Sequence, residues 1–402
     1  MSSQKDRLLA PPAQGSPVRR VMVLNYEFPP VGGGGGRIAA DFCRELARRG
    51  YTVLVQTSGH GSLPRRESRD GYEIVRHAAG RRRLHTCSVP EMAAYLGLTL
   101  LPTLRRVLNW KPQVLHVHFA VPTGVLGWLI HQITGLPYLL SAHLGDVPGG
   151  VPEQTDHLFR WLTPLTRPIW RAAAVVTTPA SHIRWLAQQA YGVPVTVLPN
   201  GIDLDLYPGQ PQPPAAPIRL ILAGRLSIQK NPLFLLQVLA GLQDLPWRLD
   251  VVGDGPLRWA CQGLAAKLGL TPRLHFHGWV RPEQVREIMC QSDVLVLPSL
   301  AEGLPLVGVQ ALGAGLAIVG SQVGGITDVV QSGRNGYLVP VNDRQAWTQA
   351  LRAVMDPGMV AGMKRQSRRL AHAFDLQEIS GRLEVLLAQS AATAQPHLGI
   401  LP

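Results

Sequence analysis

Residues 298–315 read PSLAEGLPLVGVQALGAG and follow an apolar strand expected at Val294–Leu297. A loop with one carboxylate, Glu302, and one glycine leads into a helix that opens at Pro305. Proline suits the first turn of a helix, where its missing N–H is no loss. The free N–H groups of that turn favour an anion, and Glu302 can accept hydrogen bonds from hydroxyls. The stretch therefore predicts a site for a phosphorylated sugar, with an ordinary capped helix as the alternative.

Apolar strands alternate with helical segments on both sides of this stretch. The strands expected before it are Arg20–Asn25, Thr52–Gln56, Gly71–Arg76, Val114–Val117, Pro137–Ser141, Ala173–Thr177, Val195–Leu198, Ile218–Ala223, Arg248–Val252 and Arg273–His277, and those after it are Ala317–Gly320 and Tyr337–Val339. Helices are expected between them, for example at Arg37–Arg49, Ser181–Tyr191 and Pro282–Gln291. Near-continuous apolar strands separated by helices indicate parallel sheets covered on both faces.

The 402 residues exceed the size at which one hydrophobic core stops growing, so two α/β domains are expected. A proline-rich connector, PGQPQPPAAP, divides the chain. The predicted organisation is a disordered tail (1–18), a first Rossmann-like domain (19–206), the linker (207–217), a second Rossmann-like domain (218–372), a helix that crosses back to the first domain (373–390) and a tail (391–402).

The chain is basic, with a formal net charge of +13. Its first 205 residues hold 22 Lys and Arg against 13 Asp and Glu, so most of the excess lies there. Such a surface attracts anionic lipid, anionic acceptors or nucleic acid. No nucleic-acid-binding motif accompanies the charge, so nucleic acid is not expected as a partner. An anionic membrane is a candidate partner, with an ordinary basic surface as the alternative.

Four scattered cysteines without a C-x-x-C pair argue against a disulfide framework and against a metal site. Residues 1–18 hold no apolar signal core, and no uninterrupted apolar run reaches 18 residues. The nearest approach, Val89–Leu108, is broken by Glu91, Pro102 and an arginine pair. We expect a cytoplasmic protein that docks peripherally on the inner face of the cytoplasmic membrane through this segment.

A glycine run, Gly32–Gly36, follows the first strand and precedes a helix. Glycines let the backbone approach a ligand and point N–H groups at phosphate. The run formally satisfies a dinucleotide fingerprint with Ala39. The loop is long, however, and the second strand ends in Gln56-Thr57 without the acidic residue that binds a ribose. A phosphate-facing loop is favoured over a nicotinamide site.

The second half supplies cations at a strand end. Ile218–Ala223 runs into Gly224-Arg225, and Lys230 precedes a helix that opens at Pro232. Arg225 and Lys230 can share a diphosphate there, since a guanidinium fork and an ammonium both bind phosphate oxygens. Two further strands end in glycine turns. The turn at Gly253 is expected to shape the same cleft, and the backbone of Val280, after the other turn, can hold a flat base.

In the first half, two neighbouring strands end in histidines. His116 and His118 end one strand, and the segment SAHLGD places His143 and Asp146 after the next. Side chains at the carboxyl ends of parallel strands face the crevice where α/β sheets bind ligands. His143 is therefore a candidate donor to a sugar hydroxyl or phosphate oxygen, whereas His116 and His118 are more readily read as structural.

Taken together, these segments resemble the family 4 glycosyltransferases of the GT-B fold, over roughly residues 20–390. The segments that carry the resemblance are the early glycine loop, SAHLGD (141–146), LPNGID (198–203), GRL (224–226) with Lys230, VGDGP (252–256) and EGLP (302–305). The resemblance implies two facing Rossmann-like doubly wound domains, and transfer of a sugar from a nucleotide diphosphate sugar with retention at the anomeric carbon. It implies no metal and no cofactor.

By position, the resemblance assigns Arg225 and Lys230 to the diphosphate and Glu302 to the donor-sugar hydroxyls, with His143 near that sugar. Further donor contacts are expected at Gly33, Gly34, Gly35, Gly36, Asp146, Gly253, Val280, Gly303, Leu304, Pro305, Leu306 and Gln310. Gln310 departs from the family pattern, which often has a second glutamate there for the ribose. An amide oxygen accepts from a ribose hydroxyl without charge assistance.

The residues offer no carboxylate pair for double displacement, so the departing phosphate is expected to take the proton of the acceptor. The expected acceptor is a cell-envelope glycan, a glycolipid or another lipid-linked molecule, an exopolysaccharide or a small molecule. The alternatives are a non-hydrolysing sugar-nucleotide epimerase, a nicotinamide-dependent dehydrogenase and a sugar-nucleotide-binding protein with weak or no catalysis.

Overall fold

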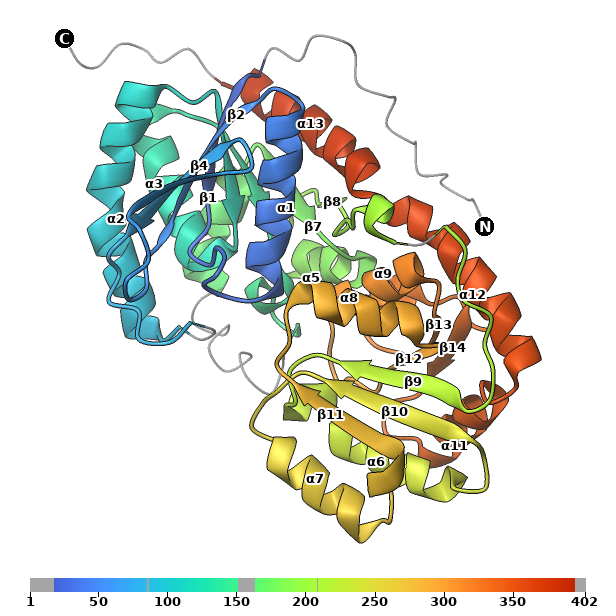
Figure 1. The fold of residues 1–402 in the computed structure, drawn as a ribbon. Coiled ribbons are helices and arrows are strands. Elements are labelled where there is room, and N and C mark those ends of the chain that lie inside the picture. Colours follow the sequence, from blue (N-terminus) through green and yellow to red (C-terminus); the bar gives the residue numbers. More distant parts are fainter. Residues whose placement is uncertain (1–17, 85–86, 151–162, 208, 395–402) are drawn as a thin grey trace, which may run out of the picture. The chain divides into compact units, whose positions relative to one another are not determined.

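The computed structural model describes residues 18–84, 87–150, 163–207 and 209–394. The chain forms two compact units, each built around its own sheet (Figure 1). Unit 1 holds 1–179, 184–199 and 376–402, and unit 2 holds 180–183 and 200–375. The predicted tail at 1–17 lies outside the described residues, whereas Val18 is buried. The described part of the proline-rich connector belongs to unit 2.

Unit 1 contains an eight-stranded sheet in the order β3-β4-β2-β1-β5-β6-β7-β8. Its strands are β1 (Arg20–Leu24), β2 (Thr52–Ser58), β3 (Arg66–Arg69), β4 (Tyr72–His77), β5 (Val114–His118), β6 (Tyr138–Ser141), β7 (Val175–Thr178) and β8 (Thr196–Val197). Every pairing is parallel except that of β3 with β4. Strand β3 was not predicted, because its sequence RESR has no apolar residue.

The labelled helices of unit 1 are α1 (Gly34–Arg48), α2 (Val89–Trp110), α3 (Val125–Thr134) and α13 (Leu376–Ala392), and α5 (Ser181–Tyr191) begins at its border with unit 2. Helix α1 buries Ile38, Phe42 and Leu46, one turn apart, together with Cys43, which packs as a small apolar residue. The structure starts this helix at Gly34 rather than Arg37, so Gly34–Gly36 form its first turn and not a loop.

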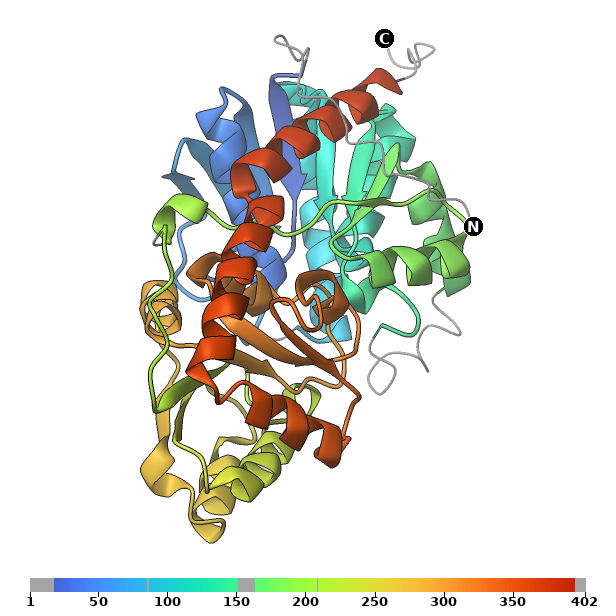
Figure 2. The same cartoon turned by 90° about the vertical axis from the view of Figure 1, so that its right-hand side faces the viewer.

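Helix α13 completes unit 1 from the far end of the chain. It packs on α1 and on strands β5, β6 and β7, and Figure 2 shows it in red over those strands. Arg49 fixes it through Glu384, with 2.8 Å between Nη1 and Oε2. The helix ends at Ala392, two residues beyond the predicted one.

Helix α2 has its polar and apolar faces in unusual places. It buries Thr99 and Thr103, whereas Leu98, Leu101 and Leu108 are 55%, 61% and 57% exposed. The Thr99 hydroxyl is satisfied inside the helix by the carbonyl one turn earlier. Among the described helices of the chain, none combines the length and hydropathy that a bilayer crossing requires.

Unit 2 contains a six-stranded parallel sheet in the order β11-β10-β9-β12-β13-β14. Its strands are β9 (Ile218–Ala223), β10 (Trp247–Val252), β11 (Leu274–Gly278), β12 (Val294–Leu297), β13 (Ala317–Ser321) and β14 (Gly336–Val339). Its helices are α6 (Pro232–Leu239), α7 (Arg258–Lys267), α8 (Pro282–Gln291), α9 (Leu306–Ala314), α10 (Ile326–Val329), α11 (Arg344–Ala353) and α12 (Pro357–Ala371). Helix α12 was not predicted.

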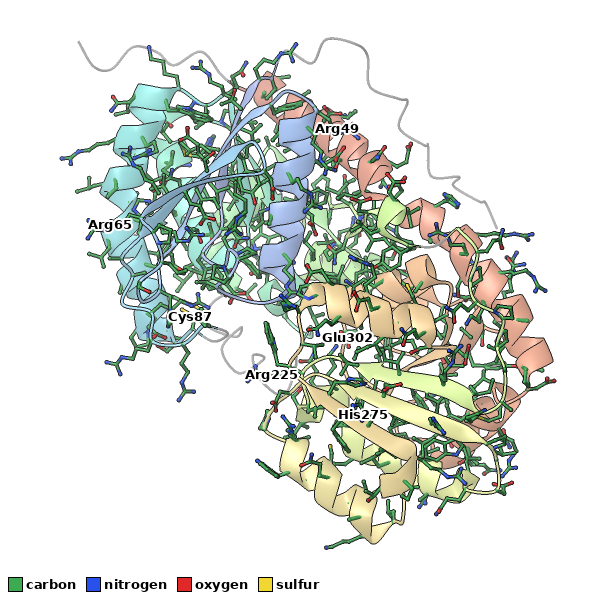
Figure 3. All side chains as sticks on the ribbon, in the orientation of Figure 1. Arg49, Arg65, Cys87, Arg225, His275 and Glu302 are labelled. Carbon is green, nitrogen blue, oxygen red and sulfur yellow. The ribbon has the colours of Figure 1, made fainter. Side chains whose placement is uncertain are left out.

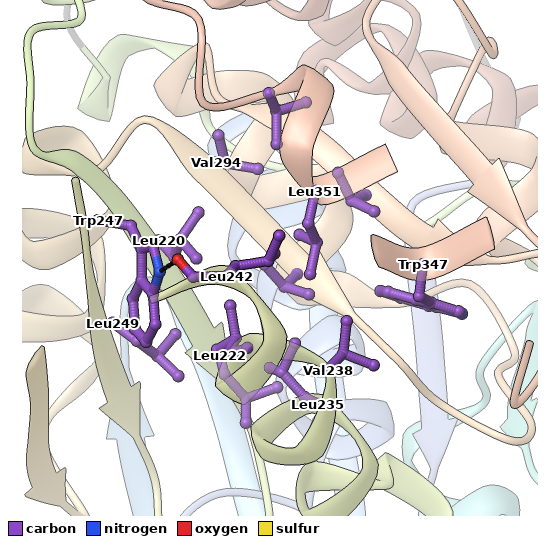
Figure 4. Packing of buried hydrophobic residues seen from close by; sticks show 14 of the residues in the cluster. Leu220, Leu222, Leu235, Val238, Leu242, Trp247, Leu249, Val294, Trp347 and Leu351 are labelled. Carbon is purple, nitrogen blue, oxygen red and sulfur yellow. Dashed lines mark hydrogen bonds between the residues drawn. The ribbon is translucent and has the colours of Figure 1, made fainter. Parts of the chain in front are cut away.

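The core of unit 2 lies between the sheet and helices α6, α7 and α11. Figure 4 shows Leu220, Leu222 and Leu249 of the sheet packed against Leu235 and Val238 of α6. A buried tryptophan there keeps its polar atom satisfied, because the Trp247 indole N–H donates to the Leu242 carbonyl at 2.8 Å. A core of this kind holds the carboxyl ends of the strands at fixed positions, where the predicted site residues lie.

Candidate active site

Two glycine turns lie against each other at the carboxyl ends of β9 and β10. Gly224 and Gly253 have φ of 140° and 130°, a region that L side chains rarely adopt. A Cβ on Gly253 would lie 2.0 Å from the Gly224 carbonyl oxygen, and the Gly224 N–H donates to the Val252 carbonyl. No side chain fits between these turns. The strand ends therefore present bare backbone, which suits close contact with a ligand.

Lys230 and Glu302 form an ion pair beside these turns, although 72 positions separate them in the chain. Lys230 ends a short 3-10 helix (Ile228–Lys230), and its side chain passes over Gly224, where a Cβ would lie 3.5 Å from the lysine Cε. Glu302 follows β12 and is only 6% exposed. Its Oε1 also accepts from the Ser299 hydroxyl at 2.7 Å. These three side chains form a half-buried charged cluster, the Lys230–Glu302–Ser299 cluster.

Arg225 follows Gly224 and is exposed. None of the described residues gives it a hydrogen bond or ion pair, so its guanidinium is available to a ligand. Figure 3 labels Arg225 and Glu302 at the same end of the unit 2 strands. The structure thus brings Lys230 to Glu302 by direct contact and leaves Arg225 as a neighbouring cation.

The backbone at Glu302 is packed against a second backbone segment as closely as the two glycine turns are packed against each other. A Cβ on Gly324 would lie 1.9 Å from the Glu302 carbonyl oxygen, and one on Gly325 would lie 1.9 Å from that of Gly303. Pro305 caps helix α9, which begins at Leu306, one residue later than predicted. The turn that carries Glu302 is therefore clamped from behind, which fixes where its carboxylate points.

Two predicted donor contacts in unit 2 lie outside this cluster. Gln310 is half-buried on α9, and none of the described residues hydrogen-bonds its amide. Val280 is half-buried after the positive-φ residue Gly278, whose carbonyl accepts from the Gly253 N–H at 2.8 Å. The backbone pairing ties the turn before Val280 to the glycine turns, whereas Gln310 keeps free hydrogen-bonding capacity.

In unit 1, His143 lies against the first turn of α1. A Cβ on Gly35 would lie 3.5 Å from the His143 Cε1 and 2.7 Å from the Phe119 Cζ. The rings of Phe119 and His143 are 4.3 Å apart between centroids. Phe119 has φ of 70°, a strained conformation for a bulky residue and a frequent mark of functional sites. The glycine run thus leaves room for an aromatic ring and an imidazole beside a helix N-terminus.

Three imidazoles, those of the buried His116 and His118 and of the half-buried His143, lie at the carboxyl ends of β5 and β6. The rings of His116 and His118 are 4.2 Å apart, and those of His118 and His143 are 5.9 Å apart. Burial lowers the pKa of His143 to about 4 and that of His116 to about 3, and it holds the pKa of His118 well below its usual value. These histidines are therefore neutral near pH 7. The Nε2 of His143 is itself buried and has no hydrogen-bond partner among the described residues.

Asp146 connects two backbone turns in the same region. Its two carboxylate oxygens accept backbone N–H groups, from His143 at 2.8 Å and from Ala120 at 2.9 Å. Burial raises the pKa of Asp146 to about 7. The side chain ties the turn after β6 to the turn after β5 and so fixes His143, while its predicted donor contact stays a prediction.

Sequence reasoning missed Ser299, Phe119 and the two glycines behind Glu302. Ser299 is visible in the opening stretch, three residues before Glu302, as a residue able to hold that carboxylate. No sequence signal marks Phe119, because its role depends on a strained backbone. Among the described residues, no group of three or more His, Cys, Asp or Glu side chains is arranged to hold a metal ion.

Two family models match the chain. The model described as Glycosyltransferase Family 4 matches residues 32–206, and that described as Glycosyl transferases group 1 matches residues 217–356. Together they span the greater part of both units.

Curated relatives and solved structures agree with these matches. D-inositol 3-phosphate glycosyltransferase of Stackebrandtia nassauensis is 28% identical over 93% of this chain and 90% of its own. A Bacillus subtilis protein described as a teichuronic acid biosynthesis glycosyltransferase is 28% identical, and this chain spans 60% of its length. Sucrose-phosphate synthase from Thermosynechococcus elongatus superposes with a TM-score of 0.81 at 21% identity, over 93% of this chain and 99% of that chain. Anabaena HepE in complex with UDP and glucose gives a TM-score of 0.71 at 19% identity, over 92% and 99%. These structures show that the fold is that of GT-B glycosyltransferases.

Proposed function

This chain belongs to the family 4 glycosyltransferases, and we propose that it moves a sugar from a nucleotide diphosphate sugar to an acceptor hydroxyl with retention of anomeric configuration. Within this proposal, unit 2 binds the donor and unit 1 presents the acceptor. The HepE structure, a complex with UDP and glucose, provides a precedent for a nucleotide in this fold.

The observation that carries the proposal is the Lys230–Glu302–Ser299 cluster beside Gly224. The ammonium of Lys230 keeps N–H donors beyond the one that Glu302 accepts, and Arg225 offers a guanidinium next to it. A diphosphate that approaches the bare backbone at Gly224 meets both cations. Glu302 keeps Oε2, to which the described residues donate no hydrogen bond, for a donor-sugar hydroxyl.

The chemistry follows from these positions. Arg225 and Lys230 stabilise the negative charge that develops on the diphosphate as its bond to the anomeric carbon breaks. The acceptor hydroxyl attacks that carbon on the face from which the diphosphate leaves. Its oxygen forms the new bond, and its proton passes to the departing phosphate oxygen. The residues then need to supply no covalent nucleophile, and a sugar–enzyme adduct would refute this route.

His143 supports the same reaction as a neutral donor or acceptor. Because its pKa is lowered by burial, the imidazole can hydrogen-bond a sugar hydroxyl without carrying charge into a site that already binds an anion. The first turn of α1 adds free backbone N–H groups beside it. We assign His143 to orientation of the transferred sugar.

We assign the acceptor to glycan biosynthesis. The teichuronic acid name of the Bacillus relative supports a cell-envelope polymer, while the inositol phosphate in the name of the Stackebrandtia relative shows that acceptors differ among similar chains. Within this class, the exposed leucines of α2 support a lipid-linked acceptor. Leu98, Leu101 and Leu108 lie on one stripe of the helix with the exposed Arg105, which is the pattern of a surface that docks on anionic lipid.

A ligand screen tests the donor assignment. The full chain is heated with UDP, GDP, ADP and TDP sugars, and we expect one of them to raise the melting temperature, because a ligand of the native state stabilises it. The same donor is then incubated with and without acceptor, and the anomeric configuration of the product is read by NMR. Formation of an epimer without acceptor would favour the epimerase alternative, and inversion would overturn the proposed route.

A vesicle experiment tests the membrane surface. We expect vesicles that contain phosphatidylglycerol to retain the protein at low salt and to release it as ionic strength rises. Leu101→Ser should weaken retention, whereas Ile133→Ser, which changes an exposed leucine-sized residue of α3, is the matched control. Failure of anionic vesicles to retain the protein at low salt would refute the membrane assignment and leave the donor assignment intact.

A further inference from the structure

A groove of about 830 Å³ lies at the amino ends of β9, β10 and β11 in unit 2, away from the predicted donor site. One wall is the proline-rich connector from Gln212 to Pro217. The floor is the face of β10 and β11 that no helix covers in Figure 1, and Figure 3 labels His275 on it. The six residues of β9 separate this end of the sheet from Arg225 by about 20 Å at the usual rise per residue.

Two arginines lie side by side on this floor. Arg219 of β9 and Arg248 of β10 are paired in register, so their side chains share one face. Like charges opposite each other on a sheet destabilise it. Arg219 is held by Asp293, with Nε and Nη2 at 3.0 and 3.1 Å from its two carboxylate oxygens. Arg248 is exposed, and none of the described residues gives it a hydrogen bond or ion pair.

A third guanidinium is held in place at the end of the groove. Arg273 donates to the carbonyls of Leu245 and Gln243 at 2.6 and 2.8 Å and lies 5.2 Å over the Trp247 ring. These contacts orient its cation without neutralising it, because no carboxylate is among them. The one carboxylate that lines the described groove, Asp250, accepts from the His277 imidazole at 2.6 Å.

The groove therefore gathers more positive than negative charge, since three arginines and one carboxylate of the described residues line it. None of the described residues gives Arg248 a hydrogen bond or ion pair. Arg273 donates hydrogen bonds to carbonyls and interacts with the Asp244 carboxylate only through space. Asp293 beneath Arg219 is shared with the buried ammonium of Lys364 at 2.9 Å. Charge of this kind in a concave site complements a small, doubly charged anion. The volume falls in the range of small-molecule sites.

We propose that this amino-end groove binds a small molecule that carries a diphosphate or a phosphate monoester, separately from the donor site. Arg248 and Arg273 contact the phosphate oxygens, and the exposed His275 is a further donor at the next position along the floor. Binding relieves the repulsion between Arg219 and Arg248. A phosphorylated sugar or a nucleotide has the required size.

Titration calorimetry with inorganic pyrophosphate tests the groove on the full chain. We expect two sites in the unchanged protein, one removed by Arg225→Ala and the other by Arg248→Glu. The charge reversal should weaken the second site about 10- to 100-fold, since it removes a charge-assisted contact and adds repulsion. Arg334→Glu changes the same charge at an exposed arginine outside the groove and should leave both sites unchanged.

Each outcome separates the groove from the donor site. A single site abolished by Arg225→Ala and unaffected by Arg248→Glu would overturn the groove and leave the proposed function standing. A single site with the reverse behaviour would support the groove and count against the donor assignment. Melting temperature gives a second measure: without pyrophosphate, Arg248→Gln should keep or raise it, because the arginine pair is repulsive. A clear fall would show a structural role and overturn the proposal.

Discussion

The side chains at the carboxyl ends of the strands differ between the two units. In unit 2 they include the ion pair of Lys230 with Glu302, whereas in unit 1 they are uncharged imidazoles. Both sheets are parallel apart from the edge strand β3, and both use bare glycine backbone at their carboxyl ends. The difference lies in the surroundings of these groups. The buried carboxylate of Glu302 is paired with the ammonium of the half-buried Lys230, whereas burial lowers the pKa of His118 and of His143 and keeps both imidazoles neutral. One architecture thus provides a charged surface for an anion and a neutral one for hydroxyls.

Removal of the unit 2 cation should have the largest effect. Lys230→Ala is expected to slow cleavage of the bond between the sugar and the diphosphate by about 10²- to 10³-fold, because the variant loses a group that stabilises the charge developing on the diphosphate. Its binding of the free nucleoside diphosphate should weaken as well. Glu302→Gln is the informative partner: it frees Lys230, so nucleotide affinity should hold or rise while turnover falls. Calorimetry measures the nucleotide affinity and initial rates measure turnover. Unchanged affinity of Lys230→Ala for the nucleoside diphosphate would contradict the role of unit 2 as the charged site.

Removal of the unit 1 imidazole should affect turnover alone. His143→Ala is expected to reduce transfer about 10- to 100-fold, the cost of one lost hydrogen bond in a dry site, with unchanged affinity for the nucleoside diphosphate. His131→Ala changes a half-buried histidine whose ring bonds the Leu136 carbonyl, and serves as the control. Weaker nucleotide binding by His143→Ala would contradict the proposal that unit 2 binds the nucleotide while His143 of unit 1 orients only the sugar.

A negative charge at position 310 should change donor affinity by less than the two preceding substitutions change turnover. If this residue faces the donor ribose, Gln310→Glu adds charge assistance to that hydrogen bond and should tighten donor binding about 3- to 10-fold. Gln291→Glu, at the end of α8, introduces the same charge at an exposed position. Equal donor affinity in Gln310→Glu and the unchanged chain would remove Gln310 from the donor contacts.

The smallest expected effect is on stability against pH. The unfolded chain protonates His143 near pH 6.5 and the native protein only near pH 4, so stability is lost as pH falls through this window. His143→Gln should reduce the slope there by at most about 1.4 kcal/mol per pH unit. Asp146 acts with the opposite sign, because its raised pKa makes stability fall as pH rises from about 3.8 to 7. Urea unfolding between pH 4 and 7 measures the slopes, and an unchanged slope in His143→Gln would show that this imidazole is charged in the native state.

Much of the fold could be predicted from the alternation of apolar strands and helices. The strands Ile218–Ala223 and Val294–Leu297 and the helix Ser181–Tyr191 were confirmed with their bounds. The misses have physical reasons. Strand β3 is a polar edge strand held only by its antiparallel neighbour, and α1 begins within a glycine run, where propensity argues against a helix.

The candidate site could be predicted only in its parts. The positions of Lys230 and Glu302 could be predicted, because they lie near strand ends and helix starts. Their ion pair could not be predicted, because it requires β9 and β12 to be neighbours in the sheet, and local sequence does not determine the order of strands. Burial of Asp146 against two backbone N–H groups and the strained backbone of Phe119 likewise arise from the packed fold.

The position of α13 in unit 1 has a consequence for biosynthesis. Strands β5, β6 and β7 receive their last covering helix only when residues 376–392 have left the ribosome. At about 5–20 residues per second, the intervening chain takes on the order of 10–35 s to make. During that time the nascent first unit exposes an apolar surface, so a stop codon shortly before Leu376 should yield an insoluble product even though unit 2 is complete.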